Sequence, residues 1–162
     1  SPLAPHTLDG SAYMKSAVFN DGGVNINLND DYQAIQWMLR NVQGSPVIVE
    51  ANTVEYRWGS RFTIYTGLPG VVGWNWHQRQ QRSVVPSEEV TRRVEEIKQF
   101  YLTIDRTQAE EFLRKYNVKY VVVGQLENLY YSGPGLGKFQ GLEGDLWQEV
   151  YRNESTVIYQ VN

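Results

Sequence analysis

The residues best suited to chemistry lie in a window without acidic side chains, between Glu55 and Glu88. The net charge of the chain is -3, yet this window holds Arg57, Arg61 and two further arginines, together with one of the two histidines. Three of the five tryptophans lie among them. Guanidinium groups beside flat aromatic rings are typical of proteins that hold sugars, phosphates and carboxylates. We name this window, residues 56–87, the Arg–Trp segment and predict that it carries the function.

Four side chains of the Arg–Trp segment are the predicted ligand contacts: Trp74, His77, Arg79 and Arg82. A helix would place Arg79 and Arg82 on one face as a phosphate clamp, while a solvated polar turn is an equal alternative. Of Trp74 and Trp76, we expect one to stack on a sugar and the other to close the core. No second histidine at metal-ligand spacing accompanies His77, which favours a structural histidine over a metal ligand.

Two acidic residues follow short apolar strands. Glu50 closes the run 47–49, and Glu127 comes just after 121–124. Ligands of open α/β sheets bind beyond the carboxyl ends of the strands, so neighbouring strands would bring both acids to the Arg–Trp segment. Such a pair could act as acid and base on a glycoside. We favour ion pairing, in which each acid holds an arginine such as Arg61, which is expected to be partly buried.

Composition excludes several classes of protein. A chain of 162 residues is one domain by size, and its negative net charge argues against general nucleic-acid binding. The absence of cysteine excludes disulfides and thiol nucleophiles. The glycines near Lys138 miss the phosphate-loop spacing and predict a flexible loop, and Asn153 begins a glycosylation sequon that a hairpin turn explains better. No apolar run approaches the roughly 20 residues that span a bilayer.

The order of the elements predicts the fold class. Helices are expected at residues 29–43, from Ser87 and from Thr107, where Glu110 completes a capping-box spacing. Strands are expected at 46–51, 62–66, 120–124, 147–152 and 156–161, the last two as a hairpin. We therefore predict a single α/β domain over residues 29–162, with a mixed, mostly parallel sheet of about five strands flanked by helices and a C-terminal antiparallel hairpin. Residues 1–28 are expected to be an irregular segment packed on this domain.

A series of motifs, taken in order, resembles a known family. Its most specific part is Thr66-Gly-Leu-Pro-Gly-Val-Val-Gly-Trp74 followed by His77-Gln-Arg-Gln-Gln-Arg82. Other members of the series are Thr7–Gly10, Asp31–Trp37, Pro46–Ala51, Lys115–Gly124 and Glu127. This series resembles the extracytoplasmic domain of the YYY family of polytopic membrane proteins from archaea and some bacteria. The family is itself similar to the GT-C glycosyltransferases, which use lipid-linked sugar donors.

The resemblance implies a location and partners. In the GT-C class the catalytic acid lies on the membrane body, so the chain is expected to be non-catalytic by itself and to partner its own transmembrane region. The opening Ser1-Pro2-Leu3 has no methionine, which also predicts a piece of a longer protein. The expected location is the extracytoplasmic face of the cell membrane.

Three hypotheses follow from the sequence. The first is a soluble domain of a membrane glycosyltransferase that binds or orients a glycan or polyprenyl-phosphate sugar, through the four predicted contacts and a pocket shaped by Glu50, Arg61 and Glu127. The second is a glycoside hydrolase that uses Glu50 and Glu127. The third is a docking domain that packs on its membrane portion or a partner subunit, because aromatic and arginine enrichment also marks interfaces. No cofactor, metal or nucleic acid is expected. The identity of the sugar, its donor or acceptor role and the oligomeric state stay open.

Overall fold

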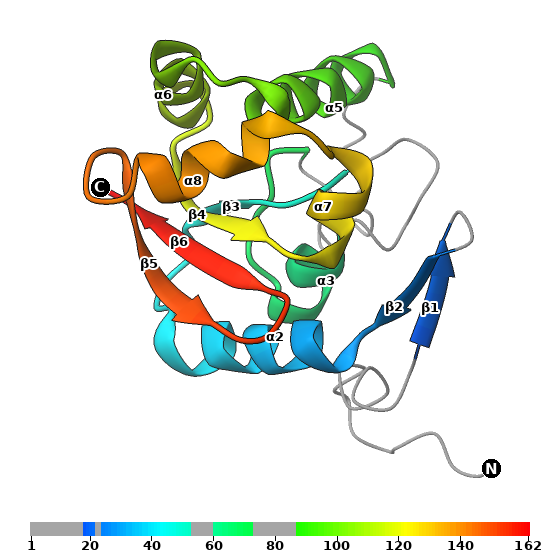
Figure 1. Cartoon of the computed structure of the whole chain (residues 1–162). Helices are drawn as coiled ribbons and strands as arrows, with labels where there is room; N and C mark the ends of the chain where they lie inside the picture. The colour runs from blue at the N-terminus through cyan, green and yellow to red at the C-terminus, as the bar shows by residue number, and fades with distance from the viewer. Residues whose placement is uncertain (1–17, 22–23, 53–59, 73–86) are drawn as a thin grey trace, which may run out of the picture.

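The centre of the domain is a four-stranded sheet. The structure is a computed structural model that describes residues 18–21, 24–52, 60–72 and 87–162. The sheet has the strand order β3–β4–β6–β5 (Figure 1). β3 (Val47–Val49) is parallel to β4 (Val118–Val123), whereas β6 (Val157–Val161) is antiparallel to β4 and to β5 (Trp147–Arg152). The predicted α/β class, mixed sheet and C-terminal hairpin are confirmed. The sheet has four strands instead of about five, and it is not mostly parallel, because one of its three strand pairs is parallel and two are antiparallel.

Helices cover both faces of this sheet. α2 (Asn29–Asn41) runs along one face, and α5 (Ser87–Leu102), α6 (Arg106–Lys115) and α8 (Lys138–Gly141) lie on the other (Figure 1). α7 (Gln125–Tyr130) directly follows β4. Within the described residues, no helix combines the length and apolar character needed to cross a bilayer.

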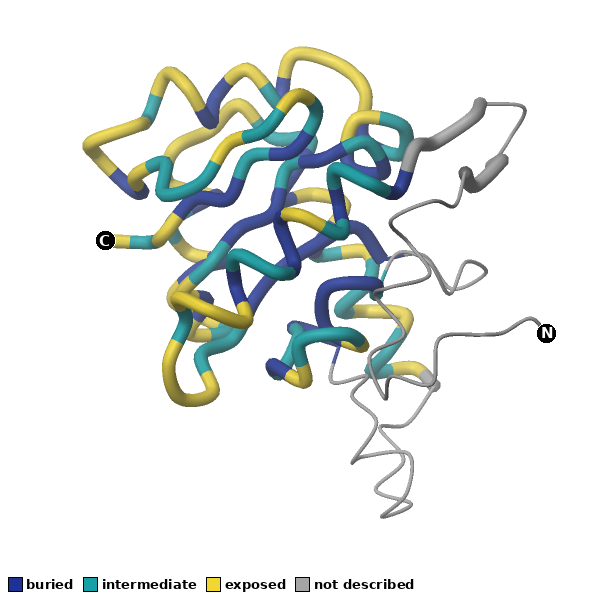
Figure 2. Tube along the Cα trace, turned by 90° about the horizontal axis from the view of Figure 1, so that it is seen from below, coloured by how far each residue is buried: buried dark blue, intermediate teal, exposed yellow. Residues whose placement is uncertain are grey.

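The core lies between these layers, where the buried stretches of the chain run through the centre (Figure 2). On α2, Ile35 and Met38 are buried, whereas Leu39 is 46% exposed. On α5, Ile97 and Tyr101 are buried. The Tyr101 hydroxyl donates to Val122 O at 2.7 Å and thereby ties α5 to the sheet.

The strand predicted at 62–66 is wrong, because this segment is the helix α3 (Arg61–Thr66). Its aromatic and β-branched residues favour a strand, but the Glu50 carboxylate accepts the backbone N–H groups of Phe62 and Thr63 at 3.0 and 2.7 Å. These are first-turn donors that a strand would not present together. Gly67 ends the helix in the left-handed region, with φ of 75°.

Three further details differ from the sequence predictions. The segment 1–28 contains an antiparallel hairpin of β1 (Val18–Asp21) and β2 (Val24–Asn27). The N-cap of α6 is Asp105, whose side chain accepts from Thr107 N at 2.9 Å, so Thr107 is not the cap. The predicted flexible loop around Lys138 is instead the 3₁₀ helix η2 (Pro134–Gly137) followed by α8.

Lys138 explains why that segment is ordered. Its side chain is buried, and Nζ donates to Tyr101 O at 2.9 Å and Gly135 O at 3.1 Å. A side chain at Gly135 would lie 2.4 Å from the Tyr101 carbonyl, so glycine is required where η2 meets the end of α5. Burial lowers the pKa of Lys138 to about 7. Lys138 and Gly135 together fix η2 against α5.

Candidate functional site

The predicted pocket residues Glu50, Arg61 and Glu127 meet in one buried cluster. Arg61 is the first residue of α3 and is fully buried. Its Nη1 lies 3.3 Å from Glu50 Oε1 and 3.2 Å from Glu127 Oε2, and its Nη2 donates to Glu127 Oε1 at 2.9 Å. Glu127 therefore binds the guanidinium with both carboxylate oxygens. The parallel pairing of β3 and β4 brings the two acids together, as the sequence predicted.

A third carboxylate, which the sequence analysis missed, completes the cluster. Arg61 Nε donates to Asp31 Oδ2 at 2.6 Å. Asp31 lies in the first turn of α2 and is buried with Ala34, Ile35 and Met38. Because positions 31, 34, 35 and 38 share one helix face, the spacing could have shown that Asp31 points into the core. We name these four residues, Asp31, Glu50, Arg61 and Glu127, the Arg61 cluster.

Backbone N–H groups stabilise two of the carboxylates. Glu50 accepts from Phe62 N, Thr63 N and the Thr63 hydroxyl, the last at 2.8 Å. Glu127 accepts from Ala51 N at 2.6 Å and from Gly124 N at 2.7 Å. The N–H groups of Phe62, Thr63 and Gly124 lie at the starts of α3 and α7, where helices leave donors without an intrahelical partner.

Burial changes the titration of the cluster. It raises the pKa of Glu50 to about 8, although the charge of Arg61 and the N–H groups of Phe62 and Thr63 lower it. Burial also raises the pKa of Asp31 against the opposing charge of Arg61. Burial lowers the pKa of Arg61, but the charges of Asp31, Glu127 and Glu50 outweigh it and raise this pKa well above its usual range. Arg61 therefore stays charged, while burial favours the protonated form of Asp31 and of Glu50.

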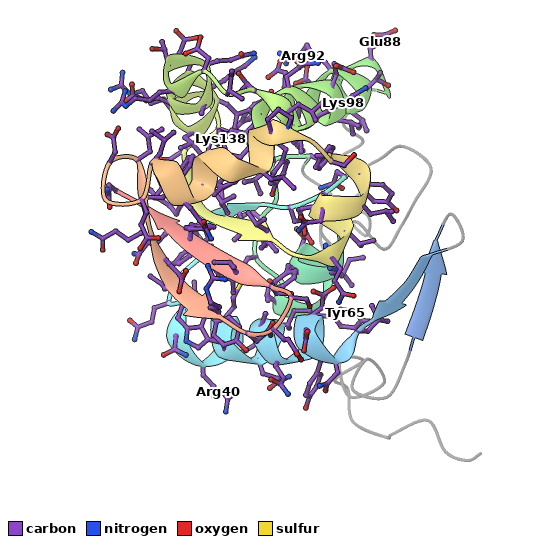
Figure 3. All side chains as sticks on the ribbon, in the orientation of Figure 1. Arg40, Tyr65, Glu88, Arg92, Lys98 and Lys138 are labelled. Atoms are coloured by element: carbon purple, nitrogen blue, oxygen red, sulfur yellow. The ribbon has the colours of Figure 1, made fainter. Side chains whose placement is uncertain are left out.

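This geometry favours the structural interpretation of Glu50 and Glu127 over hydrolysis. Both side chains are at most 1% exposed, and both bind Arg61. A glycosidase needs its acid and its second carboxylate to flank a substrate, whereas these two face a guanidinium and backbone N–H groups. Arg40, Arg92 and Lys98 instead point outward from their helices (Figure 3), as cations usually do.

The cluster also lies beside the residues that flank positions 53–59, a range that includes the first residues of the Arg–Trp segment. Asn52 and Ser60 flank residues 53–59, and Ser60 Oγ donates to Asn52 Oδ1 at 2.7 Å. Asn52 N donates to the Tyr131 hydroxyl at 3.1 Å, and the Tyr131 ring stacks on Tyr101. Further along, Arg93 Nη1 donates to Val71 O at 3.1 Å just before residue 73. The fold therefore holds these flanks in fixed positions.

A cavity of about 230 Å³ lies at the opposite end of β4, near its first residue, Val118. The two arginines that line this cavity form ion pairs with acidic residues that line it as well. Arg106 binds Asp145 through two contacts of 2.7 and 2.8 Å, and both Arg106 and Arg114 contact Glu110 at 3.3 Å. Because these charges are satisfied within the domain, the cavity does not compete with the Arg61 cluster as a candidate site.

The four predicted ligand contacts, Trp74, His77, Arg79 and Arg82, lie outside the described residues. The same holds for Trp76, so the expected division of roles between Trp74 and Trp76 stays a prediction. Of the seven predicted site residues, the structure brings together Glu50, Arg61 and Glu127. The described part of the candidate site is thus its buried ion-paired residues, and the part that would contact a ligand stays a prediction.

The fold and the cluster define an α/β domain with a mixed sheet and a buried arginine–carboxylate centre. This domain is similar in fold to the crystal structure of the C-terminal globular domain of an oligosaccharyltransferase from Archaeoglobus fulgidus. The similarity has a TM-score of 0.55 at 12% sequence identity and covers 82% of this chain and 97% of that domain. No protein-family model matches the chain, and no curated protein matches it by sequence.

Proposed function

We propose that this chain is the soluble, outward-facing domain of a polytopic membrane glycosyltransferase of the GT-C type, as the motifs that resemble the YYY family suggest. The observation that carries the proposal is the similarity in fold to the C-terminal globular domain of an oligosaccharyltransferase. That similarity covers almost the whole of that domain. The chain's own transmembrane region is its proposed partner, and the extracytoplasmic face of the membrane its proposed location.

The proposed role is to bind or orient a glycan or a polyprenyl-phosphate sugar through Trp74, His77, Arg79 and Arg82. The composition of the Arg–Trp segment supports this role, because guanidinium forks bind phosphates bidentately and indole rings stack on sugars. A described flank of the four contacts supports it as well. Arg93 Nη1 donates to Val71 O at 3.1 Å and holds the chain in place just before residue 73, and a fixed flank lowers the entropic cost of binding a ligand.

A binding experiment tests this role. We expect the domain to bind a polyprenyl-phosphate-linked oligosaccharide in detergent and an Arg79→Ala, Arg82→Ala double variant to bind it at least tenfold more weakly. Each charge-assisted hydrogen bond contributes about 1.5–3 kcal/mol, and a tenfold change corresponds to about 1.4 kcal/mol. Isothermal titration calorimetry measures the affinity.

The matched control is the Arg40→Ala, Arg114→Ala double variant, which removes the same charge from two exposed helical positions outside the segment. We expect it to bind like the unmodified domain. Equal losses of affinity in both double variants would show that the effect comes from net charge and not from the two arginines of the segment. No binding by the unmodified domain would favour the docking hypothesis.

A further inference from the structure

The Arg61 cluster contains more acids than bases. Asp31, Glu50 and Glu127 are at most 1% exposed, and Arg61 is the cation that the described residues place among them. Three ionised carboxylates and one guanidinium would leave two uncompensated negative charges in the interior. Burial penalises the charged form of a group strongly, and a buried acid takes up a proton instead. The question is which of the three acids holds it.

Hydrogen bonds answer this question for the two glutamates. A carboxylate offers about four lone-pair sites and donates nothing. The Glu50 oxygens accept from Phe62 N, Thr63 N, the Thr63 hydroxyl and Arg61 Nη1. The Glu127 oxygens accept from Ala51 N, Gly124 N and both terminal nitrogens of Arg61. Each of these four oxygens accepts from at least one N–H donor, which cannot turn into an acceptor, so a proton on either glutamate would break such a bond. For Glu50 these bonds oppose the burial that raises its pKa.

Asp31 has a different environment. Among the described residues, its carboxyl contacts Arg61 Nε through Oδ2 and the Thr156 hydroxyl, which lies 3.1 Å from Oδ1. The Thr156 hydroxyl is buried and accepts a hydrogen bond as readily as it donates one. A proton on Oδ1 would thus donate to Thr156 and leave the bond from Arg61 in place. Protonation of Oδ1 reverses the bond that Thr156 donates, but it breaks no bond from an N–H donor.

The charges around Asp31 agree with this assignment. Burial raises the pKa of Asp31 most, the charge and hydrogen bond of Arg61 on α3 lower it, the charge of Glu127 on α7 raises it, and the hydrogen bond from Thr156 lowers it. On α2 itself, Asp30 binds the Ser155 hydroxyl at 2.5 Å. The turn between β5 and β6 presents Thr156 and Asn153, whose amide donates to Asp30 O. Glu50, which follows β3, adds negative charge on the far side of Arg61.

We propose that Asp31 holds a proton at neutral pH, donates it to Thr156 Oγ1, and makes the start of α2 a pH-sensitive joint with the β5–β6 turn. Protonated Asp31 leaves one negative charge in the cluster instead of two. Loss of the proton lets the Thr156 hydroxyl donate to Oδ1 but adds a buried negative charge beside Glu127. This charge destabilises the start of α2, so the stability falls as the pH rises.

The sign of the pH dependence follows from linkage. Unfolded Asp31 titrates near pH 4, whereas folded Asp31 keeps its proton to a higher pH. Its contribution to stability is complete below about pH 4 and is lost as the pH rises toward the folded pKa. Asp31→Asn carries an amide that donates to Thr156 at every pH, so it does not lose this contribution.

The test compares Asp31→Asn with the unmodified domain in urea unfolding between pH 4 and pH 8. We expect similar stability near pH 4. Above it, the folding constant of Asp31→Asn relative to the unmodified domain should rise about tenfold per pH unit until folded Asp31 titrates. The control is Asp30→Asn, which makes the same chemical change at the neighbouring residue of α2, outside the Arg61 cluster. A rise of the same size in this control would contradict the assignment to Asp31. A constant loss of stability in Asp31→Asn at all pH values would overturn the proposal, because it would mean an ionised Asp31.

A measurement on the unmodified domain does not depend on how the variants fold. Carbon-13 NMR follows the side-chain carboxyl of Asp31 directly through a pH titration. We expect its chemical shift to be that of the protonated acid at pH 6. A shift typical of a carboxylate at pH 6, or a protonated signal that belongs to Glu50, would place the proton elsewhere and refute the assignment.

Discussion

Replacing Arg61 with methionine is expected to leave the domain unfolded at neutral pH. The substitution keeps a long apolar stem but leaves the carboxyls of Asp31, Glu50 and Glu127 buried without their shared cation. Breaking one buried ion pair by removing one partner costs about 3–5 kcal/mol, and here one change affects three acids. Small domains are stable by only about 5–15 kcal/mol. Circular dichroism and urea unfolding measure the loss.

The control for this prediction is Arg40→Met on α2. Arg40 points into solvent (Figure 3), and its Nε donates to Gln36 O on the same helix at 3.3 Å. Exposed substitutions of this kind change stability by about 0.5 kcal/mol or less. An Arg61→Met domain that is cooperatively folded, and within about 1 kcal/mol of Arg40→Met, would show that the cluster does not hold the fold together.

The second large effect is expected for Glu127→Gln, with a loss of about 3 kcal/mol. Both Glu127 oxygens accept hydrogen bonds, from Ala51 N and Arg61 on one side and from Gly124 N and Arg61 on the other. Whichever way the glutamine amide turns, its NH₂ group must face donors. A buried donor left unsatisfied costs about 1–3 kcal/mol, and more beside a charge. Urea unfolding monitored by tryptophan fluorescence measures this loss.

The matched control is Glu111→Gln on α6, because Glu111 is exposed. It makes the same chemical change at the surface, where we expect almost no effect. The contrast with Asp31→Asn is equally informative, since Glu127→Gln removes a negative charge from the cluster whereas Asp31→Asn replaces an acid that is proposed to be protonated. A Glu127→Gln domain as stable as the Glu111→Gln domain would contradict the hydrogen-bond geometry around α7.

Most of the fold could be predicted from the sequence, because its elements carry strong local signals. The apolar stripes of α2 and α5 and the runs of β3 and β4 are such signals. The segment 62–66 is the informative failure. Its local pattern favours a strand, but Glu50, 13 positions before Thr63, accepts the first N–H groups of α3. A contact between residues that far apart is not visible in a local pattern, and here it outweighs local propensity.

The candidate site was predictable in part and for a specific reason. Glu50 and Glu127 follow adjacent parallel strands, so chain topology alone brings them together. The pairing with Arg61 follows, since an arginine near two buried acids is the available counter-charge. Asp31 was not among the predicted site residues. Its register with Ala34, Ile35 and Met38 was the overlooked signal.

The central claim is that the Arg–Trp segment binds a glycan or a lipid-linked sugar, next to flanking residues that the fold holds in place. The chain has five tryptophans, and nitrogen-15 NMR resolves one indole N–H signal for each. Trp147, buried and bound to Phe139 O at 2.8 Å, and Trp37, packed on Tyr151, serve as internal references. On addition of a polyprenyl-phosphate-linked oligosaccharide, the claim predicts a shift of the Trp74 or Trp76 signal while both references stay still. Unmoved signals from Trp74 and Trp76 at saturating ligand, or shifts confined to Trp37 and Trp147, would contradict it.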